Sequence, residues 1–273
     1  MSTFADEYGP WAVVAGASDG VGAAFAEGLA ERGINVVLLA RRAAVLEEVA
    51  AGIAARTGVR TRTLAVDLAA DDAAAQIIAA TEDLAVGFLV YCAGADPAFQ
   101  PFLDTSADAA VAMVQRNCVT LLRLCHHYAA GMVERGRGGI VIFGSGAGLA
   151  GGPNMVAYSA SKAFDMVFAE ALWTELNPAG VDVVGLILGK TNTPALRRLE
   201  YSRGQIAAED HAPPGAVEVS SVVAEAFASL KEGPTVFVGD DMRAAAQLLG
   251  SVSRNQAVSF LAAAIAEAMG SAE

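Results

Sequence analysis

Residues 11–32 read WAVVAGASDGVGAAFAEGLAER. The apolar, β-branched run Trp11–Ala15 predicts a buried strand, and the alanine-rich residues that close the stretch predict a helix. Three glycines separate the two elements: Gly16 permits a tight turn, Gly20 lets backbone N–H groups approach a pyrophosphate, and Gly22 lets the helix pack close to the strand. This order of strand, glycine turn and helix predicts a dinucleotide-binding βα unit, with ordinary turn chemistry as the simpler alternative.

The same alternation of short apolar runs and longer alanine-rich segments continues through the chain. It predicts βαβ units, and right-handed crossovers then require a doubly wound parallel sheet. We therefore expect an α/β, Rossmann-like fold with a seven-stranded sheet in the order 3-2-1-4-5-6-7, helices on both faces, and ligands beyond the carboxyl ends of the strands. The predicted strands are 11–15, 34–40, 59–66, 86–93, 139–144, 181–188 and 234–239, and the predicted helices lie near 20–32, 43–56, 72–82, 104–135, 154–177, 217–231 and 254–269.

The domain organisation follows from the continuity of this rhythm. No linker rich in proline, glycine or serine, no charge block and no internal repeat interrupts residues 1–273, so we expect one domain, although the length also allows two. The long irregular stretch Thr193–Ala216 follows the sixth strand, and a segment of this length in a compact domain is usually functional. We expect a substrate lid there, with a disordered surface insertion as the alternative, and a helical extension from about 241 to 273.

Composition and charge argue against several classes of protein. Hydrophobic residues make up 54% of the chain and charged residues 18%, which is typical of a globular protein with a large core. The net charge of −12 opposes binding to nucleic acid or to an anionic membrane surface, so neither is an expected partner. The first residues are acidic where a signal peptide would be basic, and no apolar run approaches the ~20 residues that span a bilayer. We expect a cytoplasmic protein.

The cysteines and histidines indicate neither a disulfide framework nor a metal centre. Cys92, Cys118 and Cys125 are odd in number and lack C-x-x-C spacing. His126 and His127 are adjacent on one predicted helix and cannot chelate a metal together. The sequence therefore predicts a reduced protein whose chemistry needs no metal.

The end of the second predicted strand bears on the choice of cofactor. A carboxylate there would bind the ribose 2′-OH of NAD, but this chain has Arg41 and Arg42, whose guanidiniums offer forked contacts to a 2′-phosphate. A solvated pair at the start of the next helix is the alternative, although the helix dipole disfavours cations at that end. Asp19 would repel the phosphate, and we expect Arg41 to offset it by pairing with it. NADP(H) is the expected cofactor, and NAD(H) is less favoured.

A candidate catalytic group follows the fifth predicted strand. Tyr158 and Lys162 are four residues apart at the start of a predicted helix, so they project from one face. A nearby ammonium stabilises a phenolate and brings a tyrosine pKa down from ~10 toward the working range. Ser145, just after that strand, can donate to a carbonyl oxygen as negative charge develops on it. Taken alone, it could equally be a loop serine among glycines.

Together these motifs resemble the short-chain dehydrogenase/reductase family over about residues 11–240. The resemblance rests on the G-x-x-x-G-x-G spacing from Gly16, on a serine thirteen residues before a Tyr-x-x-x-Lys pair, and on 188–194, which is similar to the family's Pro-Gly-x-(Val/Thr)-x-Thr. It implies NADP(H)-dependent interconversion of a ketone and a secondary alcohol. In that reaction Ser145 would orient the carbonyl oxygen, Tyr158 would exchange the proton, and Lys162 would favour the phenolate while gripping the nicotinamide ribose.

The same resemblance assigns the remaining site residues. Asn117, in the middle of the long fourth helix, would hold a water that links Lys162 to solvent, with an ordinary exposed polar position as the alternative. Asp67 would hold the adenine amino group, although a helix N-cap is an equally simple role. The implied catalytic residues are Asn117, Ser145, Tyr158 and Lys162, and the implied cofactor-binding residues are Gly16, Ser18, Asp19, Gly20, Val21, Gly22, Arg41, Arg42, Asp67, Leu68, Ala93, Gly94, Tyr158, Lys162, Leu188, Gly189, Thr191 and Thr193.

The chain departs from the family's usual pattern at three places. Ala15 stands where the family has Thr, and Tyr91-Cys92-Ala93-Gly94 stands where it has Asn-Asn-Ala-Gly. The missing polar pair would join neighbouring strands, so losing both partners together should cost little. Leu188 replaces a proline and removes some backbone stiffness, while Gly189 and Thr193, which make the contacts, are in place.

The substrate is expected from the lid and nearby loops, whose apolar residues favour an apolar ketone of the 3-oxoacyl, steroid or terpenoid kind. Arg197, Arg198 and Arg203 could hold an acidic group or be plain surface. Within the family, the glycine turn and the Ala-Arg-Arg strand end look most like reductases of 3-oxoacyl or hydroxysteroid substrates, without those enzymes' membrane helix. The apolar candidates are Phe99, Pro101, Phe102, Ala195, Leu196, Leu199, Tyr201 and Ile206.

Two alternative functions and an oligomer complete the expectations. The fold would also suit an NAD-dependent dehydrogenase, or a non-catalytic nucleotide-sensing protein that lost the reaction. The helices near 104–135 and 154–177 are rich in small residues and resemble the pair through which the family dimerises. We therefore expect a homodimer or homotetramer with a small-molecule ketone or alcohol as substrate.

Overall fold

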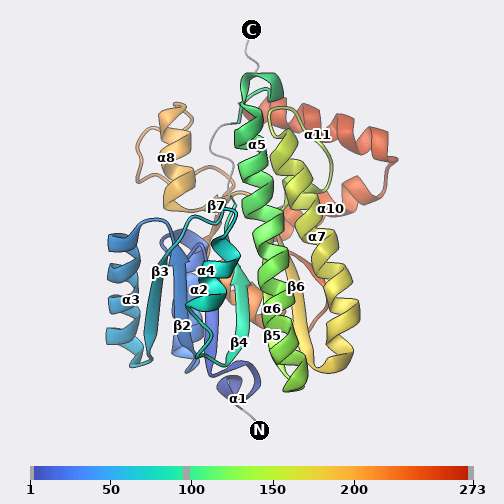
Figure 1. Cartoon of the computed structure of the whole chain (residues 1–273). Helices are drawn as coiled ribbons and strands as arrows, with labels where there is room; N and C mark the ends of the chain where they lie inside the picture. The colour runs from blue at the N-terminus through green and yellow to red at the C-terminus, as the bar shows by residue number, and fades with distance from the viewer. Residues whose placement is uncertain (1–2, 95–98, 270–273) are drawn as a thin grey trace.

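The computed structural model of the chain describes residues 3–94 and 99–269. Its central sheet consists of β1 (Trp11–Ala15), β2 (Asn35–Ala40), β3 (Thr61–Ala65), β4 (Val86–Tyr91), β5 (Gly138–Ser145), β6 (Val181–Leu188) and β9 (Thr235–Phe237). All neighbours pair in parallel in the order β3-β2-β1-β4-β5-β6-β9 (Figure 1). This confirms the predicted order, because the seventh strand of the sheet is β9. The short strands β7 (Thr191–Asn192) and β8 (Val217–Glu218) pair with each other outside the sheet.

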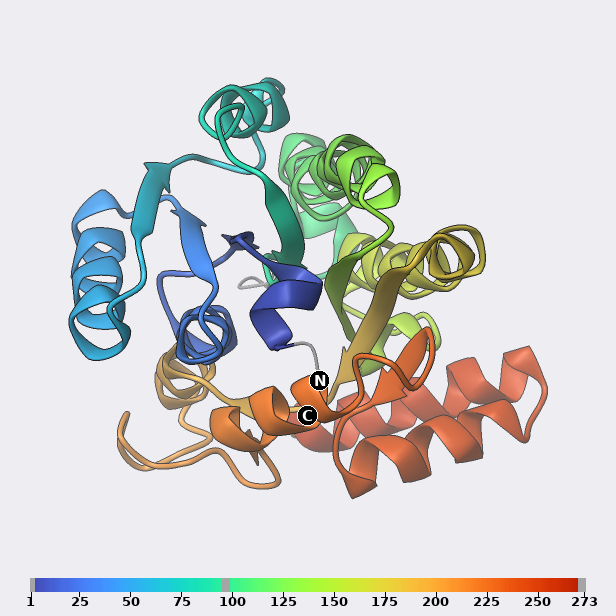
Figure 2. The ribbon, with the colours of Figure 1, turned by 90° about the horizontal axis from the view of Figure 1, so that it is seen from below.

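Helices cover both faces of this sheet (Figure 2). One layer consists of α2 (Gly20–Glu31), α3 (Ala43–Thr57) and α9 (Val219–Ala228), and the other of α4 (Ala73–Ala79), α6 (Thr120–Glu134) and α7 (Val156–Leu176). Successive strand residues point to opposite faces, so Val14 packs in the core under the first layer and Val13 in the core under the second. The central strands are covered on both sides, which is why they read as continuous apolar runs.

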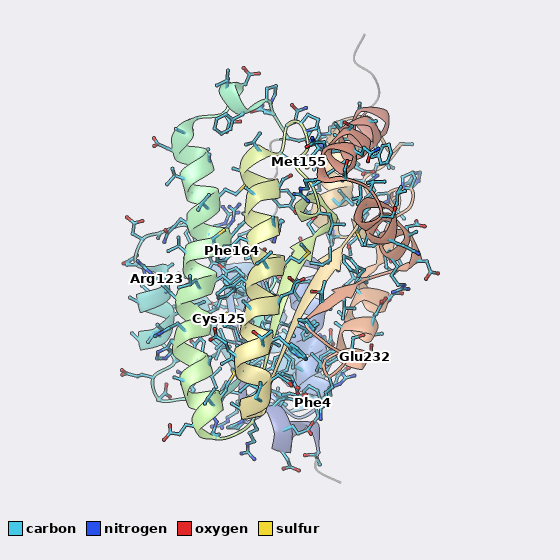
Figure 3. The ribbon with its side chains drawn as sticks, turned by 90° about the vertical axis from the view of Figure 1, so that its right-hand side faces the viewer. Phe4, Arg123, Cys125, Met155, Phe164 and Glu232 are labelled. Carbon is cyan, nitrogen blue, oxygen red and sulfur yellow. The ribbon has the colours of Figure 1, made fainter. Side chains whose placement is uncertain are left out.

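The predicted helix near 104–135 is built in three parts. It begins with α5 (Ala107–Val114), passes through a π-helical segment, η2 (Gln115–Val119), and ends with α6. Figure 3 shows this long helix beside α7 along one side of the molecule. A π-helical turn widens a helix locally and is frequent at functional sites. The predicted site residue Asn117 lies within it.

The stretch Thr193–Ala216 is not irregular throughout, and that part of the prediction is wrong. Helix α8 (Pro194–Ser202) occupies its first half (Figure 1). The Thr193 side chain accepts a hydrogen bond from the Leu196 N–H at 3.1 Å, and Pro194 takes the first helical position, where its missing N–H costs nothing. The N-cap at Thr193 and the proline after it favour the start of a helix. The Pro and Gly residues that suggested an irregular segment lie further along the stretch.

Helices lie near both ends of the described chain. The five-residue helix α1 (Phe4–Tyr8) was not predicted, because it is too short to show a period; Thr3 and Asp6 form a capping box at its start. The expected helical extension is occupied by α10 (Asp240–Gly250) and α11 (Arg254–Met269), and its last four residues lie outside the described residues. In the described part of the chain, no helix combines the length and apolarity that crossing a bilayer requires.

Candidate active site

A cavity of about 500 Å³ lies at the carboxyl ends of β1 to β4. It stands where a doubly wound sheet places its ligand, beside the switch from β1 to β4. Ala40, Val66, Arg116, Ala195 and Arg198 also line it and were not among the predicted cofactor residues. The predicted residues that line it are Gly16, Ser18, Asp19, Arg41, Arg42, Asp67, Leu68, Ala93 and Gly94.

The glycine turn forms one wall of this cavity and has the backbone that the sequence suggested. Gly16 has φ +87°, and a Cβ on it would come 2.6 Å from the Cys92 carbonyl oxygen. A Cβ on Gly22 would overlap the Gly16 carbonyl, so this glycine lets α2 pack tightly onto the turn. Val21 is buried beneath it. Gly20 has φ +55°, and its N–H donates to Asp19 Oδ1 at 2.7 Å.

Asp19 does not pair with Arg41, and that expectation is wrong. Its Oδ2 lies 3.1 Å from Nη2 of Arg198 on α8 and 3.8 Å from Nη2 of Arg42. Arg42, the N-cap residue of α3, also donates to Ser18 Oγ at 3.4 Å. Helix α8, which sequence reasoning missed, supplies the nearer cation. Two guanidiniums therefore offset the Asp19 carboxylate, and with Arg41 they give this end of the cavity an excess of positive charge.

Asp67 follows β3 and is not a helix N-cap, because the next helix, α4, begins at Ala73 and has Asp72 as its N-cap. Its Oδ1 accepts a hydrogen bond from the Ala69 N–H at 3.0 Å, which stabilises the turn after the strand. The residue also lines the 500 Å³ cavity, where its carboxylate could accept from an amino group.

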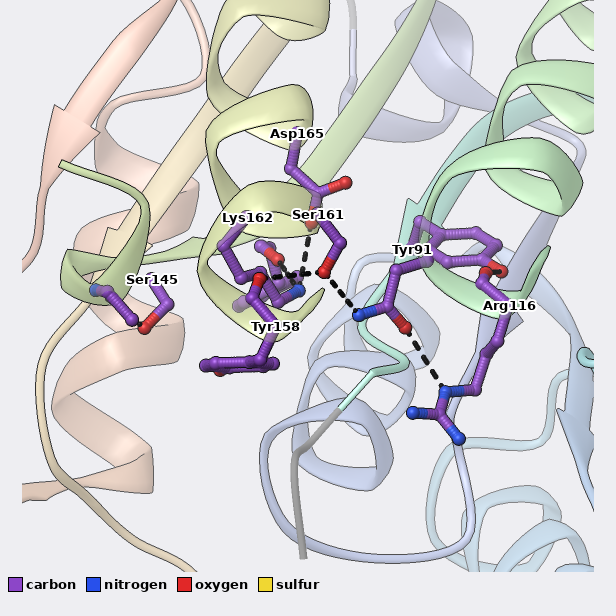
Figure 4. A network of polar contacts seen from close by, with 10 residues as sticks. Tyr91, Arg116, Ser145, Tyr158, Ser161, Lys162 and Asp165 are labelled. Atoms are coloured by element: carbon purple, nitrogen blue, oxygen red, sulfur yellow. Dashed lines mark hydrogen bonds and ion pairs between the residues drawn. The ribbon is translucent and has the colours of Figure 1, made fainter. Parts of the chain in front are cut away.

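Tyr158 and Lys162 lie on the first turns of α7, as the spacing requires. The Lys162 Nζ is 5.9 Å from the centroid of the Tyr158 ring. It donates to the Phe143 carbonyl on β5 at 2.8 Å and to Asp165 Oδ2 at 2.9 Å (Figure 4). Burial alone would lower the pKa of Lys162, but the charges of Asp165 and Tyr158 and the hydrogen bond to Asp165 outweigh burial and raise it. The ammonium beside the Tyr158 phenol is thus kept charged.

Ser145 is the last residue of β5, at the carboxyl end of the strand, and β5 packs against α7. Its Oγ accepts from the Ala147 N–H at 3.2 Å at the start of the 3₁₀ turn η3 (Gly146–Gly148). This turn packs on α7 so closely that a Cβ on Gly148 would come 2.6 Å from the Lys162 carbonyl carbon. Figure 4 draws the Tyr158 ring between Ser145 and the Lys162–Ser161 group.

Asn117 is buried, with 1% of its surface exposed, so the reading as an ordinary exposed position is wrong. Its Nδ2 donates to Ser161 Oγ at 2.8 Å, and that hydroxyl donates to the Tyr158 carbonyl at 2.8 Å (Figure 4). Arg116 Nε donates to the Asn117 Oδ1 at 3.1 Å. The widened π-helical turn therefore ties Asn117 to the first turn of α7, which carries Tyr158.

The predicted nicotinamide segment after β6 lies partly apart from the cavity. Leu188 pairs in register with Ser145, and Thr191 is buried in β7. Gly189 follows β6 directly. Thr193 lies against the glycine turn, since a Cβ on Gly20 would come 3.1 Å from its Cγ2. None of these four is among the described residues that line the 500 Å³ cavity, whose wall includes Ala195 and Arg198 of the following helix, α8.

A second, apolar cavity of about 270 Å³ lies between α5 and the start of α7. Phe102, Met113 and Val156 line it, and Tyr158 forms part of its wall. Phe102 is the one member of the expected apolar set found among its lining residues; the apolar residues of α8 are absent from that lining as far as the structure describes it. Arg116 lines both cavities, so the two adjoin.

The departures from the family pattern leave the sheet intact. Ala15 and Tyr91 are paired in register, and the Cys92 N–H donates to the Ala15 carbonyl at 3.0 Å. The Tyr91 hydroxyl donates to the Arg116 carbonyl, so it is satisfied inside the core. Burial raises the pKa of the Cys92 thiol to about 12, against a smaller opposing effect of Lys162, and the thiol is neutral at physiological pH. Losing both family partners together therefore leaves no orphaned group in this pair.

Residues 10–203 match the protein family described as short chain dehydrogenase. A 7β-hydroxysteroid dehydrogenase of Clostridium sardiniense is 33% identical over 258 residues, which cover 94% of this chain and 96% of that protein. A very-long-chain 3-oxoacyl-CoA reductase of Aspergillus clavatus is 39% identical over 178 residues, and this match covers 64% of this chain and 52% of that protein.

Solved structures also resemble this chain over most of its length. A structure from work on 7β-hydroxysteroid dehydrogenase stereoselectivity superposes with a TM-score of 0.86 at 31% identity, covering 95% of this chain and 99% of the other. A short-chain dehydrogenase from Sphingobium yanoikuyae in complex with NADPH superposes with a TM-score of 0.75 at 29% identity, covering 90% and 96%. Sequence and fold comparisons agree on one family.

Proposed function

Because the chain belongs to the short chain dehydrogenase family, and is an oxidoreductase that acts on CH–OH donors, we propose that it interconverts a ketone and a secondary alcohol on an apolar, steroid-like substrate with NADP(H). The observation that carries this proposal is the junction of the two cavities. The apolar cavity contains Tyr158, the cation-rich cavity lies above the glycine turn, and Arg116 belongs to both. A substrate in the first and a dinucleotide in the second would meet beside the tyrosine.

The cation-rich cavity fits a dinucleotide that carries a 2′-phosphate. The glycine turn leaves room that a Cβ would fill, and the start of α2 favours an anion. Arg41 and Arg42 at the end of β2 offer forked donors to a phosphate, and Arg198 adds a third cation from α8. Asp19 opposes an anion, but it is already paired with two of these cations. This balance favours NADP(H) over NAD(H).

The reaction would need one positioned donor and one proton source at the carbonyl oxygen. When bound, the nicotinamide supplies the hydride that reduces the carbonyl carbon. Ser145 would donate a hydrogen bond to the oxygen as its negative charge grows, and Tyr158 would give it a proton. Lys162 would stabilise the resulting phenolate through its ammonium. In the direction of alcohol oxidation, the same groups would act in reverse.

The apolar cavity and the relatives support a steroid-like substrate over a 3-oxoacyl thioester. The cavity walls near Tyr158 are apolar, with Phe102, Met113 and Val156 among them, which suits a rigid hydrocarbon body. The hydroxysteroid dehydrogenase relative is matched over nearly its whole length, whereas the 3-oxoacyl-CoA reductase relative is matched over about half of its own.

The test is the rate of NADPH oxidation with three ketones: a 7-oxo steroid acid, a 3-oxoacyl thioester and a small aliphatic ketone. We expect kcat/KM for the steroid to exceed the other two by about tenfold or more, and NADPH to be preferred over NADH by a similar factor. A preference for the thioester would overturn the substrate class. Binding of NADPH, seen as a melting shift, without turnover of any ketone would favour the non-catalytic nucleotide-sensing alternative.

A further inference from the structure

Asp165 is a buried carboxylate next to the candidate catalytic lysine, and neither the family resemblance nor the proposed reaction uses it. Its side chain is 3% exposed and that of Lys162 is 5% exposed, and Asp165 Oδ2 lies 2.9 Å from Lys162 Nζ. The two residues are three positions apart on α7, which brings them onto one face of the helix. In Figure 4 a dashed line joins the pair, above the Tyr158 ring.

Among the described groups around this pair, Asp165 supplies the larger negative charge that acts on Lys162, and Tyr158 the smaller. Lys162 faces Tyr158 on its own helix, the Phe143 carbonyl on β5 and the Cys92 thiol after β4. Burial raises the pKa values of the three thiols and of the Tyr91 phenol near the pair, so these groups are neutral at physiological pH. The titratable groups that face Lys162 or Asp165 from the packed elements are Tyr91, Cys92, Cys118, Cys125 and Tyr158.

Stability does not account for a carboxylate in this place. Asp165 Oδ1 is buried and has no hydrogen-bond partner among the described residues. A buried ion pair often adds nothing to stability compared with apolar residues of similar size, and an unpartnered oxygen adds a desolvation cost. The carboxylate therefore has a role other than holding the fold.

We propose that Asp165 is a positioning residue for the reaction: its buried carboxylate holds the Lys162 ammonium charged and aimed between β5 and Tyr158. This inference rests on the proposed function for its catalytic consequence. The ammonium has three N–H donors, and the Phe143 carbonyl and Asp165 use two of them. The ion pair thus fixes the ammonium group at the end of a long, flexible side chain. The third N–H donor of the ammonium is left for the site.

Removing the carboxylate gives a distinctive prediction for Lys162. A buried ammonium without a counter-ion loses its proton more easily, by up to several pH units in fully buried sites. In Asp165→Asn, an isosteric change, Lys162 should therefore titrate at least about one pH unit lower than in the wild type. Asp165→Glu keeps the charge and should restore much of the wild-type behaviour.

The lysine titration can be read directly, because the chain has just three lysines, Lys162, Lys190 and Lys231. Lysine labelled with ¹³C at Cε would give separate NMR signals, and Lys162→Met would identify the signal of interest. We expect wild-type Lys162 to stay protonated from pH 7 to pH 10, and the signal in Asp165→Asn to titrate within that range. Equal titration of Lys162 in the two proteins would overturn the proposal.

The matched control is Asp182→Asn on β6. Asp182 Oδ2 also accepts a hydrogen bond, from the Tyr8 hydroxyl at 2.6 Å, and it lies at the amino end of its strand, away from the site. This variant should leave the Lys162 titration and the pH profile of turnover unchanged.

Turnover separates positioning from a purely structural role. From pH 7 to pH 9, the ketone reductase activity of Asp165→Asn should fall by a factor about tenfold larger than the fall in the wild type. Asp165→Glu should restore most of the wild-type activity over this range. A uniform loss at every pH, with an unchanged profile, would overturn the positioning role. If the wild type reduced no ketone, the proposed function would fail, and the lysine titration would still decide whether Asp165 holds the charge.

Discussion

The two ends of the candidate site hold their charges in different ways. At the phosphate end, the side chains of Arg42 and Arg198 are 55% and 48% exposed, and that of their partner Asp19 is 28% exposed. At the catalytic end, the side chains of Lys162 and Asp165 are 5% and 3% exposed. Exposed pairs are screened by salt and contribute about 0–1 kcal/mol, whereas buried charges are costly to move or to leave unpaired.

Because the two ends differ in burial, substitutions at each end should affect a different property of the protein. The exposed cations can exchange Asp19 for a ligand phosphate at little cost, so the choice of cofactor should respond to single substitutions and to ionic strength. The buried pair has no such freedom, because water cannot replace either partner. We therefore expect substitutions at the catalytic end to change rate and pH dependence, and substitutions at the phosphate end to change cofactor affinity.

The largest effect among the ordered tests is expected for Ser145→Ala at the catalytic end. Loss of a donor to a developing oxyanion typically lowers kcat about 100- to 1,000-fold. The measurement is steady-state kcat with the best ketone and saturating NADPH. Ser159→Ala is the control, because Ser159 is a buried serine on α7 whose Oγ has no partner among the described residues. A similar fall in both variants would show that loss of any serine hydroxyl near the start of α7 lowers turnover, and would contradict the role of Ser145.

A smaller effect is expected for Arg42→Ala and Arg198→Ala at the phosphate end. Each change removes one cation, so the Kd for NADPH should rise about tenfold while the Kd for NADH changes little, and the loss should shrink as salt is added. Titration of the protein with each cofactor at two salt concentrations checks this. Arg56→Ala is the control, since Arg56 is an exposed arginine of α3 that pairs with Glu27. Equal weakening of NADH and NADPH would contradict a phosphate contact.

The smallest effect concerns the pH dependence of stability at the catalytic end. Burial raises the pKa of Asp165 to about 6, against about 3.9 in an unfolded chain. The folded chain then holds this proton more tightly than the unfolded chain, so the group's contribution to stability is complete below pH 4 and is lost as pH rises through 6. Between pH 5 and pH 8, the wild type should lose about 1 kcal/mol of unfolding free energy relative to Asp165→Asn.

Urea unfolding of both proteins at pH 5, 6.5 and 8 measures that difference. A gap between wild type and Asp165→Asn that stays constant, or that grows in favour of the wild type as pH rises, would contradict the account of this carboxylate.

The sheet and the main motifs could be predicted from sequence because their signals are local. The apolar runs around Val14 and the glycine turn at Gly16 specify a strand and a tight turn by themselves, and a motif placed after a strand must lie at the carboxyl edge of a parallel sheet. The burial of Asn117 was harder, because it depends on a π-helical turn packing against Ser161 on another helix.

The charge pairs could not be predicted because they depend on tertiary packing. Arg198 meets Asp19 across 179 positions of sequence, through a helix that was read as an irregular lid. Asp165 lies only three positions from Lys162, so their spacing was visible, but their burial follows from the packing of α7 on β5 and η2. The same holds for Arg116, whose place between two cavities appears only when α5 and the glycine turn are brought together.

The most direct measurement is turnover and cofactor binding by Tyr158→Phe, which removes one hydroxyl and keeps the ring. If the Tyr158 phenol beside the buried ammonium is the proton source, this variant should show no measurable ketone reduction while its Kd for NADPH stays within about threefold of the wild-type value. Ketone reduction by Tyr158→Phe at a rate near that of the wild type would contradict the account.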